Sequence, residues 1–175
     1  MQENGPSTTY PIEGGCDCKR IRYQLQRSPL YIHCCHCRWC QRETGSAFVI
    51  NALIEADQVT LLNETPLPCN TPSESGAGQI IYRCPHCWVA LFSTYSGLGP
   101  FFNFVRVGTL DNPDLLPPDI HIFTASKQPW FELPKGVPAV PEYYDRKQYW
   151  PPESLERREK LMPQVKAYLA SQHSE

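Results

Sequence analysis

Eight of the nine cysteines gather in three short clusters, and this pattern predicts metal binding. The clusters read CDC, CCHCRWC and CPHC, and the ninth cysteine, Cys69, lies outside them. Thiolates are good ligands for zinc, whereas disulfides are rare in a reducing cytosol. An odd number of cysteines at such close spacing therefore indicates metal ligands or catalytic thiols, and we expect the metal to be zinc.

Two of the clusters contain a C-x-x-C pair, Cys37 with Cys40 and Cys84 with Cys87. Such a pair directs two thiolates at one tetrahedral ion, and two distant pairs complete a structural four-cysteine site. A single zinc ribbon built from these pairs is the simplest interpretation. It leaves the CDC pair and Cys35 without a role.

The clustered cysteines divide more naturally into four plus three once Cys34 is set aside. Cys34 adjoins Cys35 and would point elsewhere in an extended segment, so we expect it to be a non-ligand thiol. Cys69 lies in a polar stretch and is expected to be an incidental free thiol. Four thiolates close a structural site, whereas three leave a vertex for water or substrate, as in catalytic zinc. Spacing does not say which four belong together.

Short strands separated by turn residues must position these clusters. The clearest strand is RIRYQLQR, in which Ile21, Tyr23 and Leu25 alternate with polar residues. Seven short strands in all predict a mostly antiparallel, mostly β fold. The other six are expected at residues 47–54, 58–62, 79–83, 89–95, 102–108 and 120–124.

The remaining segments are expected to be peripheral. Residues 63–78 are polar and rich in Pro, Ser and Gly, which is typical of a surface loop. Residues 153–171 carry leucines and valine at helical spacing and predict a short C-terminal helical tail, which Pro163 would interrupt or kink. The expected organisation is an N-terminal extension at 1–13, a zinc-binding domain at 14–140 and a partly helical C-terminal extension at 141–175.

Composition narrows the class of protein. A chain of 175 residues fits one domain, and 18 prolines argue against long helices. Lys and Arg total 16 against 18 for Asp and Glu, so the chain lacks the basic stripe that binds nucleic acid. No apolar run reaches the roughly 18 residues that could span a membrane, and the N-terminus does not resemble a secretion signal. We therefore expect a cytoplasmic protein without nucleic-acid or membrane partners.

The chain resembles the glutathione-dependent formaldehyde-activating enzyme family, which also includes centromere protein V. The resemblance covers about residues 14–138 and is carried by ordered motifs: GGCDC, CHCRWCQRETGSAF, CPHC, VRVGTLDNP and HIFTASKQPWFELPKGVP. It implies an all-β, two-sheet fold called a β-tent, here with antiparallel sheets held by zinc. That implication agrees with the strand count.

Carried over by motif, the resemblance implies two zinc ions per chain, one structural and one open. The structural zinc would be held by Cys16, Cys18, Cys84 and Cys87. The open, catalytic zinc would be held by Cys35, Cys37 and Cys40.

Lys19 and Trp88 stand where the family usually has glycine after each structural pair. Glycine at such a position commonly supplies a positive φ. These two residues therefore imply either altered turn geometry or tolerated strain. The bulk of Trp88 could also reshape a neighbouring pocket.

A zinc held by three thiolates carries a formal charge of −1, which partly quenches its Lewis acidity. It suits the binding of an incoming thiol, which loses its proton on coordination and can then attack an electrophile. The resemblance implies that this thiol is glutathione and the electrophile formaldehyde, giving S-hydroxymethylglutathione, a carbon–sulfur lyase activity by classification. The alternative is a non-catalytic, zinc-stabilised protein-binding module, in which a protein ligand fills the fourth position. A homo-oligomer is compatible with either.

Several residues near the open site are candidates for substrate contact. They are Arg42, Thr44, Ser46 and Phe48, which follow the last ligand, and His121. The TGS stretch is also an ordinary turn, and the alternation around His121 favours a structural histidine over one that lines a pocket. We expect His33 and His36 to lie beside the ligands or at the surface, His86 to be exposed and Trp130 to lie in the core.

Overall fold

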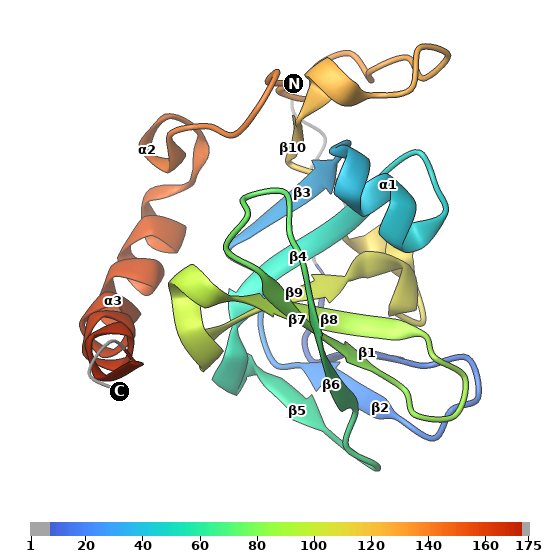
Figure 1. The fold of residues 1–175 in the computed structure, drawn as a ribbon, viewed down its shortest axis with the longest axis vertical. Coiled ribbons are helices and arrows are strands. Elements are labelled where there is room, and N and C mark those ends of the chain that lie inside the picture. The colour runs from blue at the N-terminus through green and yellow to red at the C-terminus, as the bar shows by residue number, and fades with distance from the viewer. Residues whose placement is uncertain (1–7, 173–175) are drawn as a thin grey trace.

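Two β-sheets form the framework of the chain, which the computed structural model describes over residues 8–172 (Figure 1). The smaller sheet has the order β1-β2-β5, with β1 at Ile12–Gly15, β2 at Arg22–Leu25 and β5 at Val59–Leu61. The larger sheet has seven strands in the order β10-β3-β4-β9-β8-β7-β6. These are β10 (Ile120–Ile122), β3 (Tyr31–Cys35), β4 (Val49–Glu55), β9 (Phe102–Arg106), β8 (Ala90–Tyr95), β7 (Gln79–Arg83) and β6 (Leu67–Thr71).

Every strand pair is antiparallel except β10 with β3. The parallel pair places His121 opposite Cys34 and Ile122 opposite Cys35. The chain thereby brings the residues after Ile120 beside the second cysteine cluster. The prediction of a mostly β fold with a C-terminal helix is confirmed.

The first core packs between the two sheets. The alternation in β2 puts Tyr23 and Leu25 in this core with no exposed surface, and Ile21 just before the strand is equally buried. The Tyr23 hydroxyl hydrogen-bonds Thr109 Oγ1 at 2.7 Å, so the ring is buried with its polar group satisfied. The larger sheet contributes Ala52, Ile54, Leu91 and Val105 from its inner face.

The helices lie beside the larger sheet. They are α1 (Arg38–Thr44), α2 (Arg146–Tyr149) and α3 (Pro152–Gln172), and α3 packs along the 3₁₀ segment Ser96–Phe101 (Figure 1). A second core forms here, in which Trp150 and Val165 pack with Leu53 and other residues of β3 and β4. None of the described helices is long and apolar enough to cross a membrane.

A buried ion pair joins α3 to the end of β4. Arg157 Nε and Nη2 donate to the two oxygens of Glu55 at 2.8 and 2.6 Å, and Nη2 also donates to the Ser28 carbonyl at 2.9 Å. Both side chains are less than a tenth exposed. The C-terminal helix is thus fixed to the sheet by a bidentate contact that satisfies both partners.

Three sequence-based expectations are wrong. Residues 63–78 do not form only a loop, because β6 pairs with β7 and places Cys69 opposite Ile81. Pro163 does not interrupt α3, which continues to Gln172, and the alternative of a kink there stays a prediction. Trp130 is not in the core, since its side chain is 71% exposed.

Candidate metal centres

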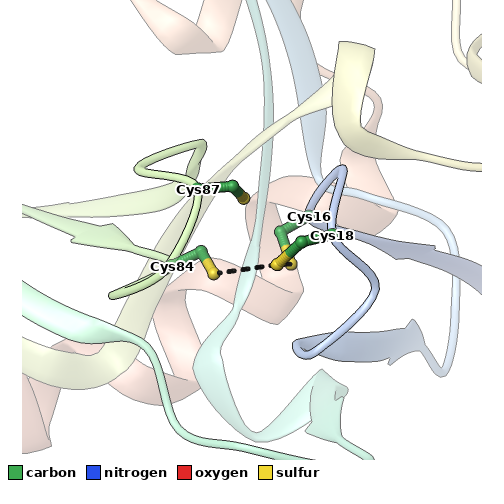
Figure 2. Close-up of side chains that lie close together, drawn as sticks. All are labelled: Cys16, Cys18, Cys84 and Cys87. Atoms are coloured by element: carbon green, nitrogen blue, oxygen red, sulfur yellow. Dashed lines mark hydrogen bonds between the residues drawn. The ribbon is translucent and has the colours of Figure 1, made fainter.

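Four cysteines meet between the two sheets (Figure 2). Cys16 and Cys18 lie on the loop from β1 to β2, and Cys84 and Cys87 lie on the turn from β7 to β8. The Sγ atoms of Cys16 and Cys18 are 3.4 Å apart, and those of Cys18 and Cys84 are 3.6 Å apart. A tetrahedral zinc with Zn–S bonds of about 2.3 Å needs S···S edges of roughly 3.8 Å. The four predicted ligands are therefore together at a spacing that fits a zinc ion.

The two loops that carry these cysteines are closed by similar backbone hydrogen bonds. The Lys19 amide donates to the Cys16 carbonyl and the Trp88 amide to the Cys84 carbonyl, both at 3.0 Å. Both turns require a left-handed residue, with φ of 61° at Lys19 and 62° at Trp88. Lys19 and Trp88 thus keep the left-handed conformation that glycine would adopt, and the protein tolerates the resulting backbone strain.

Amide groups also point at these sulfurs. The Ile21 amide donates to Cys16 Sγ at 3.3 Å, and the His86 amide donates to Cys84 Sγ at 3.5 Å. Such bonds favour the thiolate form that a metal ligand needs. His86 itself is exposed, as expected, and hydrogen-bonds Glu64.

The cysteine triad is formed by Cys35, Cys37 and Cys40, whose Sγ atoms all lie within 4.8 Å of one another. Cys35 ends β3, Cys37 caps the N-terminus of α1 and Cys40 lies in its first turn, where its amide donates to Cys37 Sγ at 3.3 Å. Hydrogen bonds from the thiols of Cys35 and Cys40 lower the pKa of the Cys37 thiol to about 3. The pKa values of the Cys35 and Cys40 thiols are raised in turn, so the metal-free triad shares its protons around one thiolate. Three soft sulfur donors thus converge at one point, which fits a zinc ion.

Strand β3 separates the triad from a second group of donors. Cys34 is adjacent to Cys35 in sequence, but its side chain lies close to those of His36 and His121. This agrees with the alternation of side chains along a strand. His36 Nε2 lies 2.9 Å from His121 Nδ1 and 3.6 Å from Cys34 Sγ, and all three residues are buried. His36 is thus a core residue, not a surface one.

This second group is best described as a hydrogen-bonded cluster. A metal bound at His36 Nε2 and His121 Nδ1 would force protons onto His36 Nδ1 and His121 Nε2. Neither of those nitrogens has a hydrogen-bond partner among the described residues. The direct imidazole–imidazole bond leaves one unpaired N–H donor, whereas a metal would leave two, and unpaired buried donors are costly.

A cavity of about 330 Å³ lies over the triad and includes the three cysteines in its lining. Most of its remaining wall is apolar, and His33 and Asn51 contribute polar groups from β3 and β4. The aromatic residues in the wall are Trp39, Tyr95, Phe104, Phe123 and Tyr143. Sequence reasoning missed these five, because they come from five separate segments and share no spacing. His33, also expected near the ligands or the surface, is buried and bonds Tyr144 at 2.7 Å.

None of the five residues predicted to contact substrate is among the described residues that line this cavity. Arg42 and Ser46 line a separate surface hollow, and Thr44 Oγ1 donates to the Cys40 carbonyl at 2.8 Å. Phe48 packs its ring against His36, with 5.4 Å between ring centroids, and His121 bonds His36. Their role in substrate binding stays a prediction.

Trp88 also lies away from the triad cavity. Its side chain is 57% exposed and lines a different hollow together with Arg83 and Arg106. Trp88 therefore does not shape the space in front of the cysteine triad.

Comparison with known proteins identifies a family and solved structures that resemble this chain. The model of the glutathione-dependent formaldehyde-activating enzyme family matches residues 11–126. A crystal structure of a Rhodobacter sphaeroides protein is similar to 61% of this chain and 97% of its own, with 17% identity and a TM-score of 0.46. No curated protein matches the chain. The matched residues include all seven proposed metal ligands.

Proposed function

The chain belongs to the glutathione-dependent formaldehyde-activating enzyme family, and we propose that it joins a thiol to formaldehyde at a zinc ion held by Cys35, Cys37 and Cys40. The product is the S-hydroxymethyl hemithioacetal of the thiol, which is S-hydroxymethylglutathione when the thiol is glutathione. By classification the reaction belongs with the carbon–sulfur lyases. One observation carries the proposal. Among the described residues, the donors grouped at this site are three sulfurs that line a cavity, so one side of the site is open to a ligand.

The chemistry follows from the charge of the site. Cys35, Cys37 and Cys40 would hold the zinc ion, which would supply a soft position for an incoming thiol and favour loss of the thiol proton. The sulfur lone pair then forms a bond to the formaldehyde carbon, the carbon–oxygen π bond breaks, and the oxygen takes up a proton. Thiol and formaldehyde thus combine with no other product, and the reverse reaction releases both.

Residues of the cavity wall can donate hydrogen bonds to the formaldehyde oxygen. Burial raises the pKa of the Tyr95 hydroxyl, so this lining group stays protonated and can donate a hydrogen bond. Asn51 Oδ1 is held by Arg106 Nη1 at 2.5 Å, which fixes the orientation of its amide. Both side chains are polar groups in a mostly apolar cavity and can orient a small aldehyde.

The four cysteines between the sheets have a different role in this proposal. Cys16, Cys18, Cys84 and Cys87 use all four positions of a tetrahedral zinc, which then links the sheets and takes no part in the reaction. We therefore propose two zinc ions per chain.

Cobalt substitution tests the open site directly. Adding glutathione to the cobalt protein should change its sulfur-to-metal charge-transfer spectrum and, in the zinc protein, accelerate adduct formation from formaldehyde. Cys37→Ser should abolish both effects, while Cys69→Ser, a cysteine outside the clusters, should change neither. An unchanged spectrum with every thiol would disprove an open site. A spectral change without faster adduct formation would keep the site and refute the reaction.

A further inference from the structure

The walls of the cavity over the triad define the kind of thiol that fits there. Its aromatic residues form two groups: Tyr95 packs edge-on against Phe104 at 4.8 Å, and Phe123 lies beside Tyr143 at 6.4 Å between ring centroids. Trp39 adds a fifth ring, held by a hydrogen bond from its Nε1 to the Pro72 carbonyl. Aromatic walls gain most from covering an apolar or aromatic body.

The charges around this cavity disfavour an anionic ligand. No Lys or Arg is among the described residues that line the cavity. The acidic residue in its lining is Glu74, which is exposed. Three thiolates around a divalent ion add a further formal charge of −1. Glutathione brings two carboxylates, and a carboxylate moved out of water without a cationic partner is strongly destabilised.

The arginines near the cavity do not make it favourable for an anionic ligand. Arg106 lies behind the cavity and is engaged by Asn51 and by Glu43 Oε2, the latter at 3.1 Å. Burial raises the pKa of the Tyr143 hydroxyl, and the charge of Arg146 partly opposes that rise, so Arg146 lies near Tyr143. Arg146 is partly exposed, and after burial its charge is the next cause that lowers the pKa of His33 in the cavity wall. This one positive charge offsets Glu74 but leaves the formal charge of −1 at the metal-loaded triad uncompensated.

Phe123 holds its ring in the wall despite an unfavourable backbone. Its φ of 56° and ψ of 38° are left-handed, and the turn is fixed by hydrogen bonds from the Thr124 amide to the Val140 carbonyl and from the Ser126 amide to the Phe123 carbonyl. A non-glycine residue in this conformation costs about 1 kcal/mol. Strain of this kind is concentrated at functional sites, and here it accompanies a phenyl ring that lines the cavity.

We propose that this site takes a neutral thiol with an aromatic or other apolar body in preference to glutathione, and that Phe123 is a residue that sets this specificity. The inference rests on the proposed function, since the thiol sulfur must reach the cysteine triad. It narrows the substrate class: the sulfur enters at the triad while the apolar body packs against the aromatic wall.

Calorimetric titration of the zinc-loaded full chain tests the preference without measuring activity. Benzyl mercaptan should bind at least about tenfold more tightly than glutathione, the gain expected from burying one ring. Phe123→Ala should lower the affinity for benzyl mercaptan by about tenfold and leave the affinity for mercaptoethanol, a small neutral thiol, unchanged. Phe123→Leu should recover most of the loss, and Arg146→Gln should leave benzyl mercaptan unaffected. Zinc content and circular dichroism establish that each variant is folded.

Three outcomes would overturn the inference in distinguishable ways. Glutathione binding as tightly as benzyl mercaptan, and losing affinity in Arg146→Gln, would show a rim that captures carboxylates, with the proposed function intact. Equal weakening of all thiols by Phe123→Ala would show a merely structural role for Phe123. Failure of every thiol to bind the zinc-loaded protein would remove the proposed function and this inference together.

Discussion

Lys19 and Trp88 have left-handed backbone conformations that glycine would adopt without strain. We expect Trp88→Gly to raise the free energy of unfolding by about 1 kcal/mol, because the strain is relieved and an exposed side chain loses little packing. Urea unfolding of the zinc-loaded protein measures the change. Trp130→Gly is the matched control, since Trp130 is also exposed but does not have a positive φ. An equal gain in both variants would contradict the assignment of strain to residue 88.

The seven proposed ligand cysteines are expected to differ in how strongly their replacement destabilises the protein. Cys87→Ser should leave the protein unfolded or aggregated, because a structural zinc supplies on the order of 10 kcal/mol of apparent folding free energy. Cys40→Ser should remain folded with one zinc, since the four cysteines between the sheets are unchanged. Metal analysis and thermal unfolding of the two variants measure this. Equal destabilisation would contradict the division into four plus three.

At the scale of elements, a buried ion pair joins α3 to the sheet in addition to the apolar packing of the helix. Arg157→Ala should lower the free energy of unfolding by about 3 kcal/mol, because it leaves the Glu55 carboxylate buried without its partner. Lys160→Ala removes an exposed ion pair with Glu156 on the same helix and should cost less than about 0.5 kcal/mol. Denaturant unfolding compares the two. Similar small losses would show that apolar packing, not the ion pair, holds α3 on the sheet.

The elements that could be predicted from sequence are those with a clear pattern. The alternation in β2 and the turn signals that bound the other six expected strands locate strands that the structure contains. Strand β3 gave no such signal, because all five of its residues are buried and no alternation arises. Helix α1 was also missed, since it is seven residues long and its cap is Cys37 rather than Ser, Thr, Asp or Asn.

The candidate site divides in the same way. Cysteine spacing and family resemblance predict the two sets of proposed ligands, and the structure brings the members of each set close to one another. The cavity wall could not be predicted, because Trp39 and Tyr143 become neighbours of the triad only through the folding of distant segments. Likewise, β6 forms within a Pro- and Ser-rich stretch because pairing with β7 outweighs its weak local propensity.

For the whole molecule, we expect metal removal to occur in two steps. A chelator should first take the zinc of the triad, which has one open side, and leave a folded protein with one zinc per chain. Removal of the second zinc should then unfold the chain, since its ligands join the two sheets. Metal analysis with circular dichroism along a chelator titration follows both steps. Loss of fold together with the first zinc, or a starting content of one zinc, would contradict this order.

The four-cysteine centre also determines how the chain would respond to mechanical force. Cys18 and Cys84 are 66 positions apart in sequence, yet their sulfurs lie 3.6 Å from each other. With a metal in place, tension on the two ends would pass through the sulfur–metal bonds and bypass the segment between them. At about 3.5 Å per extended residue, roughly 230 Å of contour length would stay hidden until those bonds break. The centre therefore acts as a clasp that shields most of both sheets from a pull on the termini.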